Sequence, residues 1–140
     1  MKIKFFYDDV NYQLRKVRSV KSLIIKVIRE EKRIPGDLNF IFTGDERIIE
    51  INREFMKHDN FTDVIAFDYC ERKTVNGEIY ISLDTVKRNA NNYKVSLRSE
   101  IIRVIIHGTL HLCGYRDKKK EERKIMKEME DQWLMRFYSE

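Results

Sequence analysis

The chain reads LRSEIIRVIIHGTLHLCGYRD over residues 97–117, and these residues predict its longest apolar helix and the turn after it. Apolar residues recur at helical spacing, so the helix is expected over 97–113. Ser96 precedes it as a residue type that commonly caps a helix. Gly114 follows where a helix often ends on a residue with positive φ. We therefore expect the chain to turn back toward this helix face.

Further strands and helices are predicted on both sides of this helix. Strands are expected at residues 2–7, 38–43, 64–69 and 78–82, and further helices at 19–33, 84–93 and 118–138. Pro35-Gly36 is expected to stop the first helix. Asn76-Gly77 is a strong signal for the turn of a hairpin.

Two apolar helix faces are predicted as well. Thr43 and Glu46 form a capping box that opens a helix after the second strand. Its apolar face is expected to present Ile48, Ile49, Ile51 and Phe55. The last helix places Ile125, Met129, Trp133 and Phe137 on one face at four-residue steps.

The resulting order, β-α-β-α-β-β-α-α-α, predicts an α+β fold in which helices pack on a small mixed or antiparallel sheet. The 140 residues are 42% hydrophobic and contain no linker, repeat or low-complexity segment, which predicts one domain over 1–140. No apolar run reaches the roughly 18–20 residues of a membrane span. No export signal is recognisable, so we expect a cytoplasmic protein without a membrane partner.

Cysteine content and charge constrain the function only weakly. Cys70 and Cys113 are too few for a disulfide framework and are expected to be reduced and buried as small hydrophobic residues. The net charge of +5 and the pI near 9.2 suit an acidic partner such as RNA. Many proteins without such a partner share this balance.

Two of the three histidines, His107 and His111, lie four residues apart in the predicted helix. This spacing puts both imidazoles on one face, roughly 6 Å apart along the axis, where both can reach one tetrahedral zinc ion. Asp117, beyond the glycine turn, can supply a third ligand. The pattern His-x-x-x-His-x-x-Gly-x-x-Asp has the ligand spacing of metzincin peptidases. Three protein ligands with an open fourth position are typical of catalytic zinc sites.

Other interpretations of these residues stay open. Gly108 stands where the metzincins carry their general-base glutamate, which argues against the peptidase mechanism. The two histidines could instead be hydrogen-bonded core residues of an apolar helix. Asp117 could be the N-cap of the last helix, expected to begin at Lys118, either alone or in addition to binding a metal.

The segment His107–Asp117 resembles the His-Gly-x-Leu-His-Leu-x-Gly-Tyr-Asp-His signature of the YbeY family. Thr62–Phe67 (TDVIAF) is similar to that family's Thr-Asp-Val-Leu-Ser-Phe block, and Gly77–Ser82 (GEIYIS) is similar to its Gly-Asp-Ile strand. The usual Thr-Val-Lys-Arg segment follows at Thr85–Arg88. Glu100 matches a glutamate that the family carries seven residues before the first histidine.

The resemblance implies a metal-dependent endoribonuclease specific for single strands, with one zinc ion in a cleft, other divalent transition metals being possible. His107, His111 and Asp117 would act through water activated by that ion. It further implies a role in ribosomal RNA maturation, including 16S rRNA 3′-end processing, and in ribosome quality control. The partners would be single-stranded RNA, pre-rRNA and the small ribosomal subunit. A non-catalytic, metal-containing ribosome-assembly factor and a metal-dependent hydrolase of another substrate are the alternatives.

The chain departs from the family pattern at three positions. Asp117 replaces the usual third histidine, and its carboxylate is expected to shift the preference slightly toward harder ions such as manganese. Met56 stands where the family usually has an arginine proposed to hold the RNA phosphate. Arg103 stands where the family often has a histidine. Arg53, Arg103 and Arg116 are therefore candidate substitutes for phosphate binding, although each could equally be a solvated surface arginine.

His58, Asp63 and Glu100 complete the candidate site. His58 lies in a loop that the resemblance places near the cleft, so it is either a proton donor or RNA contact, or an exposed loop histidine. Asp63 and Glu100 are candidates for holding a ligand imidazole by its free N–H. Glu100 lies about 10 Å along the helix from His107 and is expected to reach it poorly.

Overall fold

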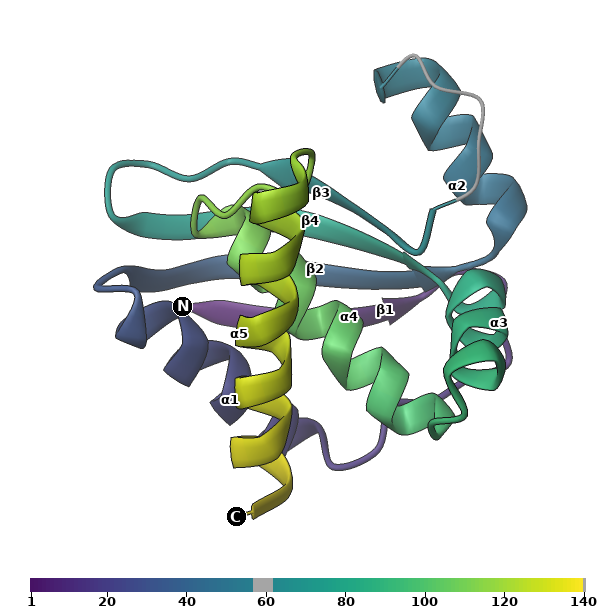
Figure 1. Ribbon diagram of the computed structural model, residues 1–140. Helices are drawn as coiled ribbons and strands as arrows, with labels where there is room; N and C mark the ends of the chain where they lie inside the picture. Colours follow the sequence, from purple (N-terminus) through teal and green to yellow (C-terminus); the bar gives the residue numbers. More distant parts are fainter. Residues whose placement is uncertain (57–61, 140) are drawn as a thin grey trace.

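A mixed four-stranded sheet covered by helices forms the framework, and the computed structural model describes residues 1–56 and 62–139. The α+β class and the element order predicted from the sequence are confirmed (Figure 1). The strands are β1 (Lys2–Tyr7), β2 (Ile34–Thr43), β3 (Val64–Asp68) and β4 (Thr74–Ser82). The helices are α1 (Val17–Glu30), α2 (Asp45–Ile51), α3 (Leu83–Tyr93), α4 (Leu97–Leu112) and α5 (Lys120–Ser139), and a π-helical segment, η1 (Asn52–Met56), continues α2.

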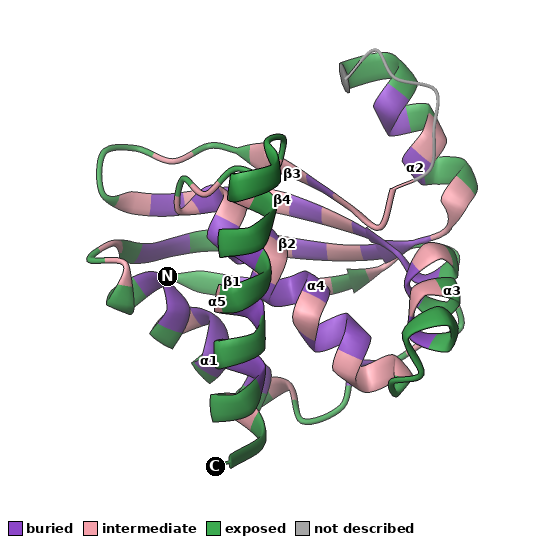
Figure 2. Cartoon of the chain, viewed as in Figure 1, coloured by how far each residue is buried: buried purple, intermediate pink, exposed green. Residues whose placement is uncertain are grey.

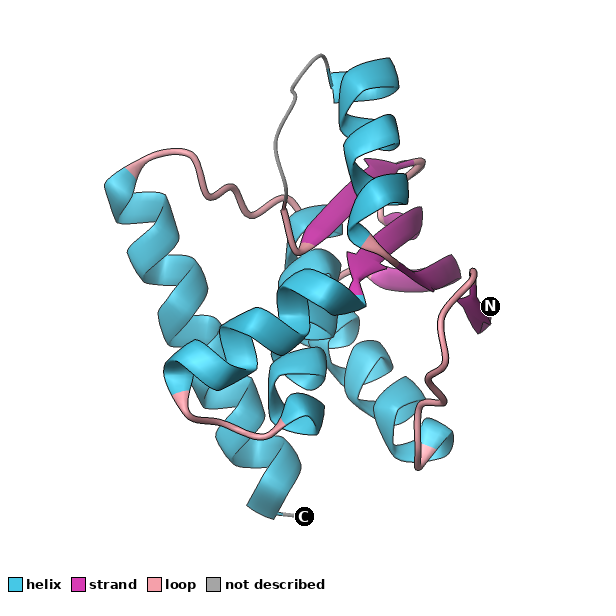
Figure 3. Ribbon diagram, turned by 90° about the vertical axis from the view of Figure 1, so that its right-hand side faces the viewer, coloured by secondary structure: helices cyan, strands magenta, loops and turns pink. Residues whose placement is uncertain are grey.

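The strand order is β1-β2-β4-β3. The pairs β1–β2 and β2–β4 are parallel, whereas β3 and β4 form an antiparallel hairpin. Because neighbouring side chains of a strand point to opposite faces, Phe40, Phe42, Ile79 and Ile81 all face one side and are fully buried. The helices α1, α4 and α5 gather on this side of the sheet (Figures 2 and 3).

Helix α4 is the central element of the core. It contacts α1, α3, α5, β3 and β4, and most of its residues are buried, including Gly108. The Ser96 side chain accepts a hydrogen bond from the Ser99 N–H, so the predicted cap is confirmed. A second, smaller cluster lies on the opposite face of the sheet, where Ile48 and Ile51 of α2 pack with Ile65. No helix within the described ranges has the length and apolarity needed to cross a bilayer.

The predicted position of the hairpin turn is wrong, because Asn76 and Gly77 lie inside β4. The turn lies at Glu71–Thr74 instead, where two backbone hydrogen bonds close it and Arg72 has φ of 55°. Gly77 is required there by close packing rather than by a turn. A Cβ atom at Gly77 would lie 2.6 Å from the Phe67 carbonyl oxygen and 2.7 Å from Leu112 Cδ1.

Gly77→Ala is therefore expected to lower the free energy of unfolding by about 1–3 kcal/mol, as overpacking of a tight core does. Urea unfolding followed by circular dichroism measures this loss. Gly44→Ala is the control, because a Cβ at Gly44 meets only one side-chain atom, at 3.1 Å, and should cost less. Equal stability of the Gly77 variant and the unsubstituted chain would contradict the packing argument.

Two predicted boundaries in the first half are also wrong. Helix α1 ends at Glu30, and Pro35-Gly36 lie within β2 rather than stopping the helix. The helix ends in a Schellman motif, in which Arg33 N–H donates to the Ile28 carbonyl and Lys32 takes positive φ. Helix α2 is capped by Gly44 and not by Thr43, because Thr43 is still in the strand; Asp84 Oδ2 accepts from the Asp45 N–H instead.

The predicted apolar faces of α2 and α5 each need a correction. Phe55 is exposed, although its ring meets Phe67 edge-on with centroids 5.5 Å apart. Helix α5 begins at Lys120 rather than Lys118, and Ile125 is 49% exposed. The buried residues of α5 are Met126, Glu130, Trp133 and Leu134. The cysteines Cys70 and Cys113 are free and half-buried.

Candidate metal centre

His107, His111 and Asp117 converge on one point at the C-terminal end of α4. The Nε2 atoms of both histidines lie 3.1 Å from Asp117 Oδ2. The two imidazole rings are 4.6 Å apart between centroids and nearly perpendicular, at 79°. One ligand atom from each residue lies within 4.8 Å of the others, and no other such group of His, Cys, Asp and Glu is found in the described part of the chain.

The turn after α4 brings Asp117 back to the histidines. It is a second Schellman motif, in which Tyr115 N–H donates to the Leu110 carbonyl and Gly114 N–H donates to that of His111. Gly114 has φ of 108°, as predicted, a conformation that few residues other than glycine adopt readily. Asp117 is not the N-cap of α5, since that helix begins three residues later.

The remaining nitrogen of each imidazole is held by an acceptor. His107 Nδ1 lies 2.5 Å from Glu130 Oε2, and His111 Nδ1 donates to the Tyr115 carbonyl oxygen at 2.9 Å. A carbonyl oxygen only accepts, so Nδ1 of His111 carries a proton. A neutral ring then presents the Nε2 lone pair to the Asp117 carboxylate. Such an arrangement of facing acceptors calls for positive charge between them, either from protons or from a metal ion.

These donor atoms fit a transition-metal ion. Two imidazole nitrogens and one carboxylate oxygen are ligands that zinc accepts at about 2.0–2.2 Å, and in a tetrahedral site such ligands stand roughly 3.4 Å apart. The observed separations of 3.1 Å between each Nε2 and Asp117 Oδ2 are close to that spacing. Metal-binding histidines typically donate their second N–H to a carboxylate or a backbone carbonyl, and Glu130 and Tyr115 provide one of each.

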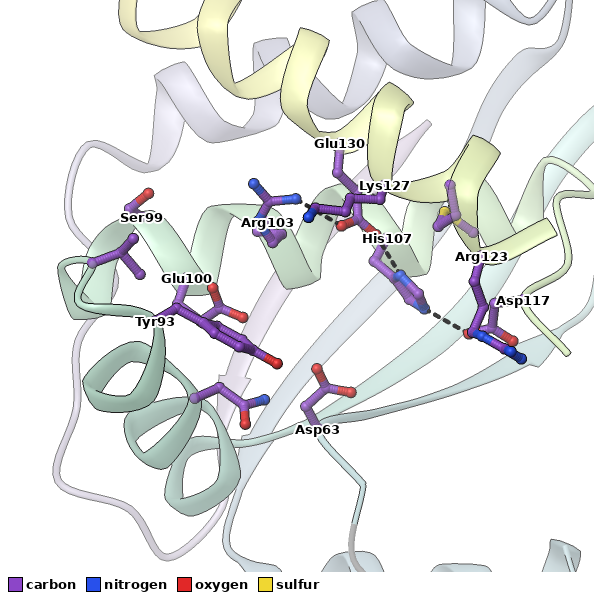
Figure 4. Close-up of a pocket in the computed structure, with 13 residues that line it drawn as sticks. Asp63, Tyr93, Ser99, Glu100, Arg103, His107, Asp117, Arg123, Lys127 and Glu130 are labelled. Atoms are coloured by element: carbon purple, nitrogen blue, oxygen red, sulfur yellow. Dashed lines mark hydrogen bonds and ion pairs between the residues drawn. The ribbon is translucent and has the colours of Figure 1, made fainter. Parts of the chain in front are cut away.

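A cavity of about 550 Å³ opens beside this centre, between α3, α4 and α5 (Figure 4). His107 and Asp117 lie at one end of it, together with Arg123 of α5, whereas the Lys127 side chain extends toward Arg103 (Figure 4). The cavity continues past Arg103 and Glu130 toward the start of α4. The residues that line it there are Asp63, Asn89, Tyr93, Val95, Ser99 and Glu100.

The electrostatics of the cavity are dominated by carboxyl groups. The pKa of Glu100 is raised to about 6, mainly by burial; the charge of Arg103 opposes this rise, and the charges of Asp63 and Glu130 contribute to it. Burial likewise raises the pKa of Asp63, and His107 offsets part of that effect. Burial lowers the pKa of His107, but the hydrogen bond and charge of Glu130 outweigh it, so the pKa is raised.

The structure separates the other predicted site residues into three groups. Asp63 and Glu100 line the cavity, and no hydrogen bond between either carboxyl and an imidazole is found among the described residues; the Nδ1 atoms are bound by Glu130 and by the Tyr115 carbonyl. Arg103 also lines the cavity, with its guanidinium bound to Glu130 at 2.9 Å and Asp131 at 2.5 Å. Arg53 and Arg116 are exposed and do not line it. His58 lies outside the described residues.

Sequence reasoning missed three residues of α5, namely Glu130, Arg123 and Lys127. Glu130 is only 7% exposed, and it joins His107 and Arg103 of α4 to α5. Its position in the sequence could have indicated this role, because Glu130 lies four residues from both Met126 and Leu134 and therefore on the same buried face of α5. A buried glutamate is rare without a partner, so its position on that face indicates one.

Glu100→Gln is expected to stabilise the protein at neutral pH. A folded-state pKa of about 6, against 4.5 for the free group, means that ionised Glu100 costs stability above pH 6. The cost is relieved as the pH falls from 6 to 4.5 and vanishes below 4.5, where the group becomes protonated in both states. At pH 7.5 the variant should therefore gain about 1–2 kcal/mol in free energy of unfolding. At pH 4.5 the gain should fall below about 0.5 kcal/mol; a pH-independent difference in urea unfolding would contradict this.

Fold and site together define the class of the protein as an α+β domain with a candidate metal centre of three ligands beside an open cavity. A family model described as Endoribonuclease YbeY matches residues 3–138. The chain belongs to the YbeY family, as the motifs of α4 and β4 predicted.

Individual relatives agree with this assignment. The chain is 41% identical to Endoribonuclease YbeY of Parabacteroides distasonis, over 96% of this chain and 94% of the relative. It is 39% identical to Endoribonuclease YbeY of Flavobacterium psychrophilum, over 97% and 96%. Among solved structures, the solution structure of TM1509 from Thermotoga maritima matches with a TM-score of 0.65 and 26% identity, covering 98% of this chain and 89% of that one.

Proposed function

We propose that this chain is a metal-dependent endoribonuclease specific for single-stranded RNA, and that His107, His111 and Asp117 hold its metal, one zinc ion. The proposal rests on one observation. The Nε2 atoms of His107 and His111 converge on Asp117 Oδ2, while the Nδ1 atom of each ring is hydrogen-bonded to an acceptor on its other side. The names of the relatives supply the substrate class, since each is called an endoribonuclease. Because Asp117 is a carboxylate, manganese is a second candidate for the same position.

The chain's own residues would hold and orient the reacting groups. A metal ion bound there would supply Lewis acidity and lower the pKa of water. Glu130 and the Tyr115 carbonyl fix the ring planes of His107 and His111, so the Nε2 atoms need no rearrangement to bind. Arg123 lies beside Asp117, and Lys127 lines the same cavity farther along, so their positive charges would neutralise an RNA phosphate there (Figure 4). These two residues are better candidates for that role than Arg103, whose guanidinium is already bound to two carboxylates.

Ribosomal RNA is the substrate that we propose, with pre-rRNA and the small ribosomal subunit as partners. The net charge of +5 supports a nucleic-acid partner, because cationic side chains attract the phosphate backbone. Within that proposal we include 3′-end processing of 16S rRNA and a role in ribosome quality control. Action on ribosomal RNA would place the protein in the cytoplasm.

The structure adds an argument against the peptidase alternative. A Cβ atom at Gly108 would lie 2.9 Å from Ile79 Cγ2 of β4. Position 108 therefore faces the sheet and not the metal centre. A glutamate there would be buried against Ile79 and could not serve as a general base beside the ligands.

An end-labelled single-stranded RNA, the matching duplex and casein, each incubated with the purified protein, test the proposal. We expect the single strand to be cut, the duplex and casein to stay intact, and a chelator to stop the cutting. Zinc or manganese added back after removal of the chelator should restore it. Cutting that persists in the chelator would overturn the metal-dependent mechanism. A protein that binds RNA and metal without cutting would be the non-catalytic assembly factor instead.

A further inference from the structure

At the end of the cavity away from the metal centre, the side chain of Glu100 opens into the cavity. The residue as a whole is only 4% exposed, and no hydrogen bond or ion pair to its carboxyl is found within residues 1–56 and 62–139. Asp63 and Tyr93 line the same cavity (Figure 4). No buried side-chain oxygen or nitrogen of the described residues lacks a partner, so the Glu100 carboxyl is accessible from the cavity and is placed to accept hydrogen bonds from a ligand.

The chemistry of this end excludes a phosphate as that ligand. Asp63 and Glu100 are both acidic, and the closest cation, Arg103, is occupied by Glu130 and Asp131. Phosphate would meet like charge from Asp63 and Glu100 here, whereas Arg123 offers positive charge beside Asp117 at the other end (Figure 4). The ligand group at Glu100 must therefore be uncharged or cationic and rich in donors.

This end of the cavity offers an exposed aromatic ring. Tyr93, at the C-terminal end of α3, is 66% exposed and borders the cavity, so one face of its phenol ring can take a stacked base. Aromatic side chains bind the bases of single strands in this way, irrespective of sequence. Asn89 and Ser99 add an amide and a hydroxyl at the rim. The cavity volume of about 550 Å³ lies within the range of small-molecule sites.

We propose that Glu100, Asp63 and Tyr93 form a nucleobase subsite that prefers guanine and selects one base next to the cleaved phosphate. Guanine presents its N1–H and N2 amino group side by side, so one carboxylate accepts both in parallel. Adenine and cytosine each offer one exocyclic amino group, and uracil offers a single N3–H between two carbonyls. The proposal rests on the proposed RNA substrate, but the binding preference can be measured without cleavage.

Titration of the ¹⁵N-labelled protein with GMP, AMP, CMP and UMP at pH 7.5, followed by NMR, tests the subsite. The phosphate is common to all four probes, so differences in affinity report the base. We expect GMP to bind about tenfold more tightly than UMP, within the discrimination that one bidentate pair provides. The shifted amides should include those of Asn89, Ser99 and their neighbours.

Three variants separate the subsite from general nucleotide binding. Glu100→Gln should lower the affinity for GMP about tenfold and leave the affinity for UMP unchanged, because the amide offers only one acceptor oxygen. Tyr93→Ala should lower the affinities for all four nucleotides by the same factor. Glu128→Gln, an exposed position on α5 outside the cavity, should change none of the affinities.

Equal affinities for GMP and UMP, an unchanged preference in Glu100→Gln, or no binding of any nucleotide would overturn the subsite. RNA cutting measured in parallel keeps the two proposals apart. Cutting without a guanine preference removes the subsite and leaves the endoribonuclease. A guanine preference without cutting leaves the subsite and removes the catalytic proposal.

Discussion

His111→Ala is expected to empty the metal centre and to lower the rate of RNA cleavage by on the order of 10³-fold, the scale seen when a principal charge-stabilising group is removed. His111 supplies one of the three ligand atoms, and its Nε2 lies 3.1 Å from Asp117 Oδ2. Two remaining ligands leave the ion weakly held. Metal content by mass spectrometry and the rate of cutting of end-labelled single-stranded RNA are the two measurements.

An exposed glutamate of α5 provides the comparison. Glu128→Gln changes a described side chain that is not part of the converging group, so it should retain the same metal content as the unsubstituted chain. The fold should survive in His111→Ala, because the His111 side chain is only half-buried and its loss leaves the core of α4 intact. A folded, metal-free His111→Ala protein that still cuts RNA would refute the catalytic role of this centre.

Replacing Glu130 is expected to weaken metal binding although Glu130 is not one of the three ligands. Its carboxylate holds His107 Nδ1 at 2.5 Å and Arg103 at 2.9 Å. Loss of such an outer partner typically costs 10–100-fold in metal affinity, so we expect about 10-fold for Glu130→Gln and about 100-fold for Glu130→Ala. The amide keeps an acceptor oxygen but loses the charge, which accounts for the order. Competition with a fluorescent chelator measures the affinity.

Asp131→Asn is the matched control for Glu130. Asp131 also binds Arg103, at 2.5 Å, but it makes no contact with His107. If Glu130 acts by orienting the imidazole, the Asp131 variant should keep its metal affinity within about twofold. Equal losses in both variants would show that Arg103 and the helix contact matter, and that the His107 hydrogen bond does not.

The three converging side chains could be predicted because they lie close together in sequence. His107, His111 and Asp117 fall within one helix end and one turn, so the helical period and a glycine at positive φ suffice to bring them together. The β-α order was predictable for the same reason, because each element is marked by its own periodicity.

Glu130 could not be predicted in this way because its contact with His107 spans 23 residues and depends on how α5 is rotated. The residues that follow Ile125 at four-residue steps and those that follow Met126 are shifted by a single position. Only the packing of α5 against α4 decides that the face containing Met126 is the buried one. The predicted position of the hairpin turn was wrong for a similar reason. Asn76-Gly77 has the sequence of a turn, but the glycine is required by the approach of Leu112 and the Phe67 carbonyl to β4.

The hydrogen bond that Glu130 accepts from His107 also connects occupancy of the centre to attachment of the C-terminal helix. Helix α5 contributes no ligand atom, yet it carries the carboxylate that orients one of the ligands. Thermodynamic linkage makes such an effect mutual: if docked α5 increases affinity for the ion, then the ion increases the stability of the docked helix by the same free energy. Depleting a cell of the metal would thus loosen helix α5 as well as halt the chemistry.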